Sequence, residues 1–378
     1  MRITDAEAII LDSGTDYGAP DQAGEAHGPR YTALIRVDTD AGVSGFADVD
    51  SNPWIVKAVV DSPAYIPGFS ASLKDAVLGE DPFNLEYLWD KMYQHSWYHG
   101  RRGVALHAIS GIDIALWDIV GKALGRPIFE LLGGKRREKI EAYASTLFRA
   151  KPDHMHEAVR SYLEQGFRAI KFGWGSFGQD RSHDVRLLAA ARDAAGDDVE
   201  LMVDGHIRGN FKRVLRTVRA IEALRPRWVE EPISADEVGA IGRLSDLVET
   251  DIASGEQLSS IEEFEELMTK GRVDIVQPDL SRCGGFTAVR RIATLARQYR
   301  VEVVPHAWVS DILTAASLHV NAWLPSSLFV EFNVTRSPIV RSILREPLQL
   351  VDGYLRVPEG PGLGIEIEES VVSDHRIA

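Results

Sequence analysis

Residues 199–206 read VELMVDGH, a short apolar run that ends in Asp204 and is followed by glycine. Similar runs, each closed by a side chain capable of chemistry, recur along the second half of the chain. They read AIK (169–171), RWVE (227–230), DIASGE (251–256), VDIVQPD (273–279), VEVVPH (301–306) and SSLFVE (326–331). The closing residues lie 23 to 33 positions apart, the length of one strand plus one helix. This rhythm predicts a barrel of parallel strands, whose carboxyl ends meet at one rim.

Eight strand candidates support the barrel, because eight parallel strands are the number that closes one. They span 140–145, 168–172, 199–204, 227–231, 251–255, 273–278, 301–305 and 327–332. Amphipathic stretches such as HDVRLLAAARDAAG and NFKRVLRTVRAIEAL separate them and have the length of crossover helices. The sequence therefore predicts an α/β barrel domain over residues 136–342.

The first 135 residues have a different pattern. The alternating stretch 31–49 contains a central Asp-Thr-Asp-Ala-Gly turn signal and predicts an antiparallel hairpin. Helical patterns follow at 84–93 and 104–124, and the second is apolar on most faces, so we expect it to be buried. These segments predict an α+β domain over residues 1–135. The tail, 343–378, returns to strand and turn chemistry, and we expect it to complete this first domain.

Composition excludes several classes of partner. The chain has 378 residues, is 45% hydrophobic and carries a formal net charge of −14, which argues against nucleic acid or an anionic membrane as a partner. A small anionic substrate is still compatible, because a bound cation dominates the field inside a site. Cys283 is the only cysteine, and we expect it to serve packing in a reducing compartment. With no signal-peptide core and no long apolar run, we expect a cytoplasmic protein.

Three of the predicted strands end in carboxylates: Asp204, Glu230 and Glu256. A single acid at a strand end more often caps the next helix, but three on consecutive strands favour a metal site. Carboxylate oxygens suit octahedral Mg²⁺ better than Zn²⁺, which prefers His and Cys. Glu231 is the neighbour of Glu230, and alternation along a strand lets only one of the two face the barrel axis.

The motifs LMVDGH, WVEEP, ASGEQ, VQPDLSRCGG and VPHAW together resemble the enolase superfamily, and within it the mandelate racemase subgroup. The block SGIDIALWDIVGKALGRPIFELLGG (110–134) is also similar, so the resemblance covers nearly the whole chain. It implies a modified TIM barrel of the (β/α)7β type under an α+β capping domain. It also implies Mg²⁺ held by Asp204, Glu230 and Glu256, with a Lys or His base.

The resemblance assigns His306 as the base that removes the proton next to a substrate carboxylate, with Asp279 accepting its ring N–H. On the other face the subgroup commonly places a Lys-x-Lys motif, where this chain reads Lys171-Phe172-Gly173. Lys171 can hold a substrate carboxylate oxygen as a fixed charge. The second lysine is replaced by glycine. Racemisation needs a base on each face, so this departure favours elimination.

His206, in Asp-Gly-His, is the candidate acid for a departing hydroxide; a solvent-exposed loop histidine is the alternative. Its combination with the His306 and Asp279 pair resembles the galactonate dehydratase group of acid-sugar dehydratases. Glu331 matches a position at which the subgroup keeps a glutamate near the substrate carboxylate. We expect Glu331 to carry a proton and donate it in a hydrogen bond to the enediolate, with helix capping as the alternative.

Substrate contacts are expected from loops of the first domain, which close the barrel in this family. The candidates are His27 and Arg30 in the segment 24–30, Trp54, and Tyr98 in HSWYHGRR (95–102). Solvated loops are an equally good interpretation of these segments. Trp308, beside His306, is a candidate for lining the pocket.

The sequence therefore predicts a Mg²⁺-dependent dehydratase that converts a sugar acid (an aldonate or aldarate) to a 2-keto-3-deoxy acid. The alternatives are an epimerase, racemase or cycloisomerase of the same superfamily, and a non-catalytic barrel. A hydrolytic metal barrel ranks last, because no His-x-His stands at the first barrel strand. The resemblance also implies a homo-oligomer.

Overall fold

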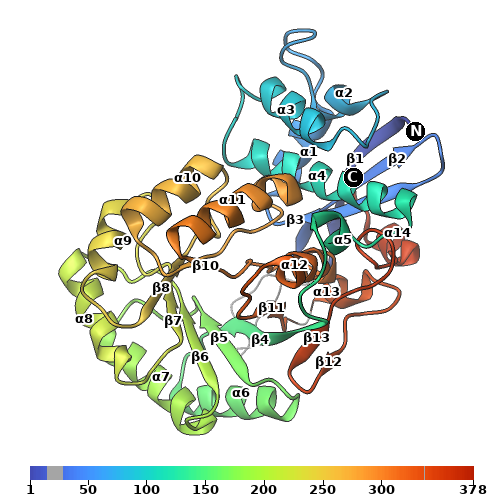
Figure 1. The fold of residues 1–378 in the computed structure, drawn as a ribbon. Helices are drawn as coiled ribbons and strands as arrows, with labels where there is room; N and C mark the ends of the chain where they lie inside the picture. The colour runs from blue at the N-terminus through green and yellow to red at the C-terminus, as the bar shows by residue number, and fades with distance from the viewer. Residues whose placement is uncertain (15–28, 336) are drawn as a thin grey trace.

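The computed structural model describes residues 1–14, 29–335 and 337–378, which form a capping domain on a barrel (Figure 1). The capping domain contains an antiparallel sheet in the order β1-β2-β3. Its strands are β1 (Ile3–Asp12), β2 (Tyr31–Thr39) and β3 (Ser44–Val49). The predicted hairpin is confirmed, since β2 and β3 pair in antiparallel register from Ala33 opposite Val49 to Asp38 opposite Ser44.

Helices complete the capping domain, and the first, second and fourth of them contact the sheet. They are α1 (Pro53–Asp61), α2 (Leu73–Val77), α3 (Leu85–His95), α4 (Val104–Leu124) and α5 (Ile128–Leu132). Helix α4 ends at Gly125, whose φ of 64° closes it in the left-handed conformation. By length and composition α4 could cross a membrane, but 89% of its most apolar window is buried, as in the core helix of a soluble protein. Its predicted burial is confirmed.

The barrel repeats a strand and a helix seven times and ends with an eighth strand. The strands are β4 (Lys139–Leu147), β5 (Ala169–Gly173), β6 (Glu200–Asp204), β7 (Trp228–Glu230), β8 (Asp251–Ser254), β9 (Ile275–Val276), β10 (Glu302–Val303) and β11 (Val330–Asn333). Strands β4 to β10 pair in parallel in chain order, and β11 pairs with β4 on its other side. The predicted (β/α)7β architecture is confirmed.

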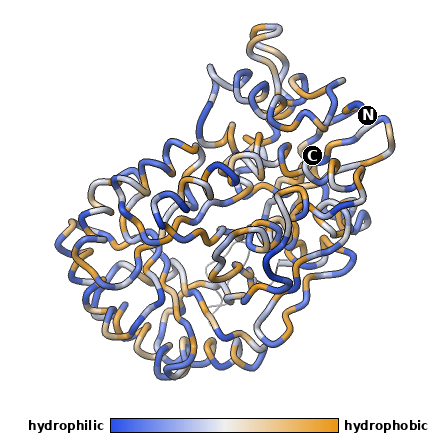
Figure 2. Tube along the Cα trace, viewed as in Figure 1, coloured by the Kyte–Doolittle hydropathy of each residue, from blue (hydrophilic) through white to orange (hydrophobic). Residues whose placement is uncertain are grey.

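The crossover helices lie on the outside of the strands (Figure 1). They are α6 (Pro152–Glu164), α7 (Arg181–Ala195), α8 (Phe211–Glu222), α9 (Val238–Ser245), α10 (Ile261–Glu266) continued by the π-helical turn η1 (Leu267–Gly271), α11 (Gly285–Tyr299) and α12 (Asp311–Trp323). Hydrophilic and hydrophobic residues alternate along the outer helices, as expected of one apolar face packed on strands (Figure 2).

The tail divides between the two domains. After α13 (Pro338–Ser342), the hairpin of β12 (Leu350–Val351) and β13 (Tyr354–Arg356) extends the barrel sheet, because β13 pairs antiparallel with the start of β4. Helix α14 (Glu369–His375) returns to the capping domain, where the Ile10 amide donates to the Ala378 carbonyl at 2.8 Å. The prediction placed the whole tail in the first domain. The hairpin differs because β4 offers its free edge to it.

Candidate active site

The floor of the site is an apolar layer inside the barrel, to which each strand or its flanking residue contributes one side chain. The layer consists of Tyr143, Ala169, Met202, Trp228, Ala253, Ile275, Val304 and Phe329. Side chains two residues further along a strand point to the same side. Position by position, the next layer therefore contains Ser145, Lys171, Asp204, Glu230, Gln277, His306 and Glu331. This two-residue step explains why polar residues far apart in sequence meet above an apolar floor.

Asp204, Glu230 and Glu256 each offer a carboxylate oxygen, and the three oxygens lie within 4.8 Å of one another. All three residues are buried, and Asp204 Oδ1 has no hydrogen-bond partner among the described residues. Burial and the charge of Glu230 raise the pKa of Asp204 well above its usual value. Burial and Glu230 also raise the pKa of Glu256, although His306 opposes this. A cluster of buried acids with an unpartnered oxygen fits a divalent cation with hard oxygen ligands.

Lys171 lies among the acids rather than in the open cavity. Its Nζ donates to Glu230 Oε1 at 2.7 Å and lies 3.0 Å from Glu331 Oε1 and 3.7 Å from Asp204 Oδ2. Burial lowers the pKa of Lys171, but these carboxylates outweigh it and raise that pKa well above the usual value. This raised pKa favours the charged form of Lys171, and its role as a fixed charge for a substrate carboxylate stays a prediction.

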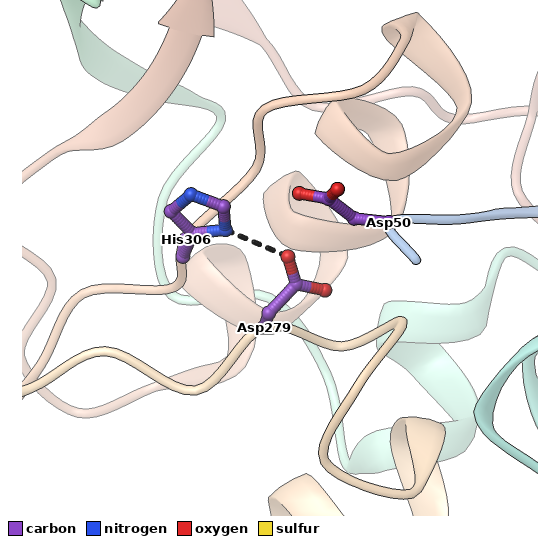
Figure 3. A group of neighbouring side chains, drawn as sticks. All are labelled: Asp50, Asp279 and His306. Carbon is purple, nitrogen blue, oxygen red and sulfur yellow. Dashed lines mark hydrogen bonds and ion pairs between the residues drawn. The ribbon is translucent and has the colours of Figure 1, made fainter. Parts of the chain in front are cut away.

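His306 and Asp279 form the predicted pair. His306 Nδ1 lies 2.7 Å from Asp279 Oδ2, and the two side chains face each other beside Asp50 of the capping domain (Figure 3). The other Asp279 oxygen accepts from the Ser281 amide at 2.7 Å and its hydroxyl at 2.6 Å. These contacts hold the carboxylate, so it can orient the imidazole ring. His306 Nε2 is left facing Glu256 Oε2, 3.3 Å away.

Charge around His306 favours its protonated form. Burial lowers the pKa of His306, but Glu331, Glu256 and Asp279 outweigh this and raise it to about 10. Burial alone would raise the pKa of Asp279, but its hydrogen bond with His306 and the charge of Arg282 outweigh burial and lower it. The pair is thus an imidazolium and a carboxylate as long as the neighbouring acids keep their full charge.

Glu331 differs from its prediction. Its Oε1 accepts from the Ser145 hydroxyl at 2.6 Å, and its Oε2 accepts from the Ala307 amide at 2.6 Å. Burial alone would raise the pKa of Glu331, but Lys171, His306 and these two donors lower it to about 2. The expectation of a proton-bearing Glu331 is wrong for the structure described here, because every polar neighbour of this carboxylate is a donor or a cation. Glu331 holds Lys171 in place.

These groups open into a cavity of about 430 Å³. Its lining comes from both domains: Asp50, Ser145, Thr146, Leu147, Gly173, Trp174, Asp204, Glu256, Arg282, His306 and Trp308. Arg282 joins the domains, because its Nη2 lies 2.7 Å from Asp50 Oδ2 and its Nη1 donates to the Glu256 carbonyl at 2.8 Å. On the β5 side stands Gly173, where a Cβ would lie 2.7 Å from Asp204 Oδ2. A side chain at that position would require the Asp204 carboxylate to shift, and Gly173 itself supplies no second base.

Comparison with protein families agrees with this geometry. Residues 154–371 match the model described as enolase C-terminal domain-like. Residues 11–133 match the mandelate racemase / muconate lactonizing enzyme N-terminal domain. The chain belongs to the enolase superfamily. Within it, the N-terminal match places the chain in the mandelate racemase subgroup, as the motifs predicted.

Similar proteins of the enolase superfamily include both dehydratases and cycloisomerases. A D-galactarolactone cycloisomerase from Agrobacterium fabrum is 33% identical, over 100% of this chain and 99% of that protein. A D-galactonate dehydratase from Ralstonia pickettii is 34% identical, over 91% of this chain and 90% of that protein. The crystal structure of a 3,6-anhydro-D-galactonate cycloisomerase from Zobellia galactanivorans is 30% identical with a TM-score of 0.88, covering 100% of both chains.

His206 is not among the described residues that line the cavity of Asp204, Glu256 and His306. It lines a separate cavity of about 230 Å³ with Arg208, Phe211 and Ile233. Gly205, with a φ of 138°, redirects the chain directly after Asp204, so residue 206 does not continue the strand. The role of His206 as an acid stays a prediction that this arrangement does not favour.

The predicted substrate contacts fall in different places. Trp308 lines the cavity, whereas Arg30, Trp54 and Tyr98 are not among its described lining residues. Arg30 pairs with Asp12 through two hydrogen bonds, at 2.9 and 3.1 Å. Trp54 packs edge-on against Tyr31, and Tyr98 packs against Phe69. His27 lies outside the described residues. Contact of these four residues with substrate remains a prediction.

Sequence reasoning missed several residues of this superfamily site. Glu231 has a φ of 44° directly after β7 ends, so strand alternation does not apply to it, and both it and Glu230 are buried. Burial and Glu256 raise the pKa of Glu231 to about 8. Asp50 lies in the capping domain, and no sequence motif around it indicates a role in the site. Arg282, three residues after Asp279, could have been found by its place in SRCGG.

Proposed function

We propose that this chain is a Mg²⁺-dependent dehydratase of sugar acids, which removes the proton at C2 and eliminates the 3-hydroxyl. One observation carries the proposal. The three-carboxylate cluster and the His306–Asp279 pair share one cavity, while the β5 side presents Gly173 instead of a base. A one-sided base suits elimination, because racemisation requires proton transfer at both faces of the carbon.

Asp204, Glu230 and Glu256 would hold the metal, and their oxygen-only chemistry fits Mg²⁺. When bound there, Mg²⁺ supplies Lewis acidity, which makes the hydrogen next to a carboxylate acidic enough to remove. Lys171 adds a permanent positive charge on the same side. Its contacts with Glu230 and Glu331 keep it fixed before the substrate arrives.

His306 is the proton acceptor in this proposal. Asp279 holds Nδ1, which leaves Nε2 directed into the cavity. Only a neutral imidazole can accept a proton, and the free carboxylates oppose that form. Neutralising the charge of Glu256 removes one of the groups that raise the pKa of His306, which favours the neutral imidazole.

A cycloisomerase is the second candidate. Two observations favour it: His206, the predicted acid for a departing hydroxide, lines another cavity, and a cycloisomerase aligns with the whole of this chain. Both candidates begin by removing the same C2 proton. They differ in whether water leaves.

The screen that tests the proposal uses purified protein, Mg²⁺ and a panel of aldonic acids, aldaric acids and their lactones. Semicarbazide detects keto acids, and mass spectrometry reports whether the product has lost one water. A keto acid lighter by one water supports the dehydratase, and a product of unchanged mass supports the cycloisomerase. Loss of activity in EDTA and in His306→Asn is expected in both cases. If no sugar acid is altered, both candidates are wrong.

We also propose that the protein works as a homo-oligomer in the cytoplasm. Support for the compartment comes from Cys283, a buried free thiol, because no disulfide is available to require an oxidising environment.

A further inference from the structure

One aromatic residue in the cavity wall has an unusual backbone. Trp174 follows Gly173 at the end of β5 and lines the cavity with Asp204 and Glu256. Its φ of 45° lies in the left-handed region, which bulky side chains rarely adopt. Strain of this kind persists where the surroundings enforce it, and it concentrates at functional sites.

The strained backbone is tied to the metal cluster. The Trp174 amide donates to the Asp204 carbonyl at 2.9 Å, and the Phe177 amide donates to the Trp174 carbonyl at 3.1 Å. The two glycines that flank Trp174 are also closely packed. A Cβ on Gly173 would lie 2.7 Å from Asp204 Oδ2, and one on Gly175 would lie 2.5 Å from the Phe148 carbonyl oxygen. The position of residue 174 is thus fixed relative to a predicted metal ligand.

No ring contact or hydrogen bond of the indole with the described residues accounts for this strain. Trp174 is 43% exposed, and within the described part of the chain its ring forms no aromatic pair and no hydrogen bond. Other exposed tryptophans are packed: Trp54 against Tyr31, and Trp97 against Phe69. A strained residue that presents a bare aromatic face to a cavity is better explained by a ligand than by folding.

The charges around the cavity indicate which ligand. Among its described lining residues Arg282 is the one lysine or arginine, and its guanidinium is already bound to Asp50 and to backbone carbonyls. Residues 15–28, outside the described part, contain no lysine or arginine in the sequence. The metal cluster can receive one carboxylate. The rest of the substrate would meet Trp174, Trp308 and Thr146 in the cavity wall. The two indole rings suit the C–H groups of a sugar chain, and the threonine hydroxyl suits its hydroxyl groups.

We propose that Trp174 is a specificity-determining residue, and that its ring packs against the uncharged polyol chain of a sugar acid with a single carboxylate. The inference rests on the proposed function and narrows its substrate class from sugar acids in general to aldonic acids. An aldaric acid would place its second carboxylate beside Asp50 and the indole ring, with no free lysine or arginine among the described lining residues to receive it.

The test measures binding by calorimetry to the Mg²⁺-loaded His306→Asn protein, which should not turn substrate over. Six-carbon aldonic acids and the aldaric acids of matching configuration are the probes. We expect the best aldonic acid to bind at least about tenfold more tightly than its aldaric counterpart. Trp174→Ala should weaken aldonic acid binding about tenfold, and Trp174→Phe should keep most of it, because stacking of this order accompanies a buried aromatic contact. Mg²⁺ affinity should be unchanged.

Two controls separate a binding role from a structural one. Trp97→Phe changes a tryptophan of similar exposure, 49%, outside the cavity and should leave binding unchanged. Trp174→Gly relieves the positive φ, so its Tm should be at least that of the parent, whereas a structural role predicts a lower Tm.

The outcomes are distinguishable. If sugar acids bind and Trp174→Ala binds them as tightly as the parent, or if aldaric acids bind more tightly, this inference is wrong while the proposed function stands. If no sugar acid binds to the Mg²⁺-loaded protein, the proposed function is overturned together with it.

Discussion

Lys171 shows how charge is balanced at the scale of one residue. A buried ammonium would normally be costly, but here Glu230, Glu331 and Asp204 surround it within 3.7 Å. Removing one partner of a buried ionic group leaves the others uncompensated. Lys171 therefore stabilises the metal-free protein as well as serving the substrate.

Lys171→Met should lower the free energy of unfolding by about 3–5 kcal/mol, because it leaves buried carboxylates without their cation. Urea unfolding in EDTA measures this without a contribution from metal. Lys270→Met is the matched control: Lys270 pairs with Glu266 on the surface, and its loss should cost no more than about 1 kcal/mol. Equal stability of Lys171→Met and the parent would contradict this account of the cluster.

Asp279 acts through His306 and does not reach the reacting carbon. Asp279→Asn should lower kcat by about 10²-fold or more, with little change in KM, because the imidazole loses the group that orients it. Steady-state kinetics on whichever sugar acid the screen identifies gives both constants. Asp193→Asn disrupts a comparable contact with His156 on the surface and should leave kcat unchanged. A raised KM with normal kcat would assign Asp279 to binding instead.

At the scale of elements, the capping domain is attached through α4, which packs on the barrel helix α11. Asp113 of α4 is fully buried at this contact, where its oxygens accept from the Thr287 hydroxyl at 2.6 Å and amide at 3.0 Å. Burial raises the pKa of Asp113 to about 7, in spite of these bonds. The attachment of the two domains is thus sensitive to pH.

Proton linkage gives the direction in which the contribution of Asp113 to folding stability changes with pH. A carboxyl whose pKa is raised by folding stabilises the fold fully below its unfolded pKa of about 4, and that contribution is lost as the pH rises through about 7. Asp113→Asn removes the titration. Between pH 5 and pH 8, its free energy of unfolding relative to the parent should rise by about 2–3 kcal/mol. Urea unfolding at both values checks this, with the exposed Asp90→Asn on α3 as control. A relative stability independent of pH would contradict it.

The strand repeat made the barrel predictable, and the two-residue step along each strand made most of its polar layer predictable. The exceptions have local causes. His206 follows Gly205, whose positive φ ends the regular step, and Glu231 lies beyond the end of β7. Glu331 was placed correctly, but its ionisation depends on Lys171 and Ser145 of other strands, which a linear pattern does not weigh.

For the whole molecule, the site depends on both domains. Asp50 at the end of β3 and Arg282 of the barrel form an ion pair at the cavity wall, more than 200 residues apart in sequence. No local pattern could predict such a contact, because it arises only when the capping domain is docked. Arg30, Trp54 and Tyr98 were predicted from the composition of their loops. Composition does not show which loop residues reach the cavity after docking, and these three are not among its described lining residues.

Metal binding should stabilise the whole fold. A cation that binds only the folded state adds about 2.7 kcal/mol at a concentration of 100 Kd. Mg²⁺ should therefore raise Tm of the parent, whereas Asp204→Asn, which removes the negative charge of a predicted ligand, should lose most of that increase. Thermal unfolding with Mg²⁺ and with EDTA measures both, and the exposed Asp198→Asn should respond like the parent. A Tm that does not respond to Mg²⁺ in the parent would contradict the metal assignment.

In the proposed reaction, His306 removes the C2 proton of a sugar acid on one face. Proton NMR in D₂O, with Mg²⁺ and a panel of aldonic acids, follows the C2–H signal directly, whether or not a later elimination occurs. We expect the parent to consume that signal for at least one acid, and His306→Asn to do so about 10²-fold or more slowly while its Tm still rises with Mg²⁺. Consumption of the C2–H signal by His306→Asn at the parent rate would contradict the account.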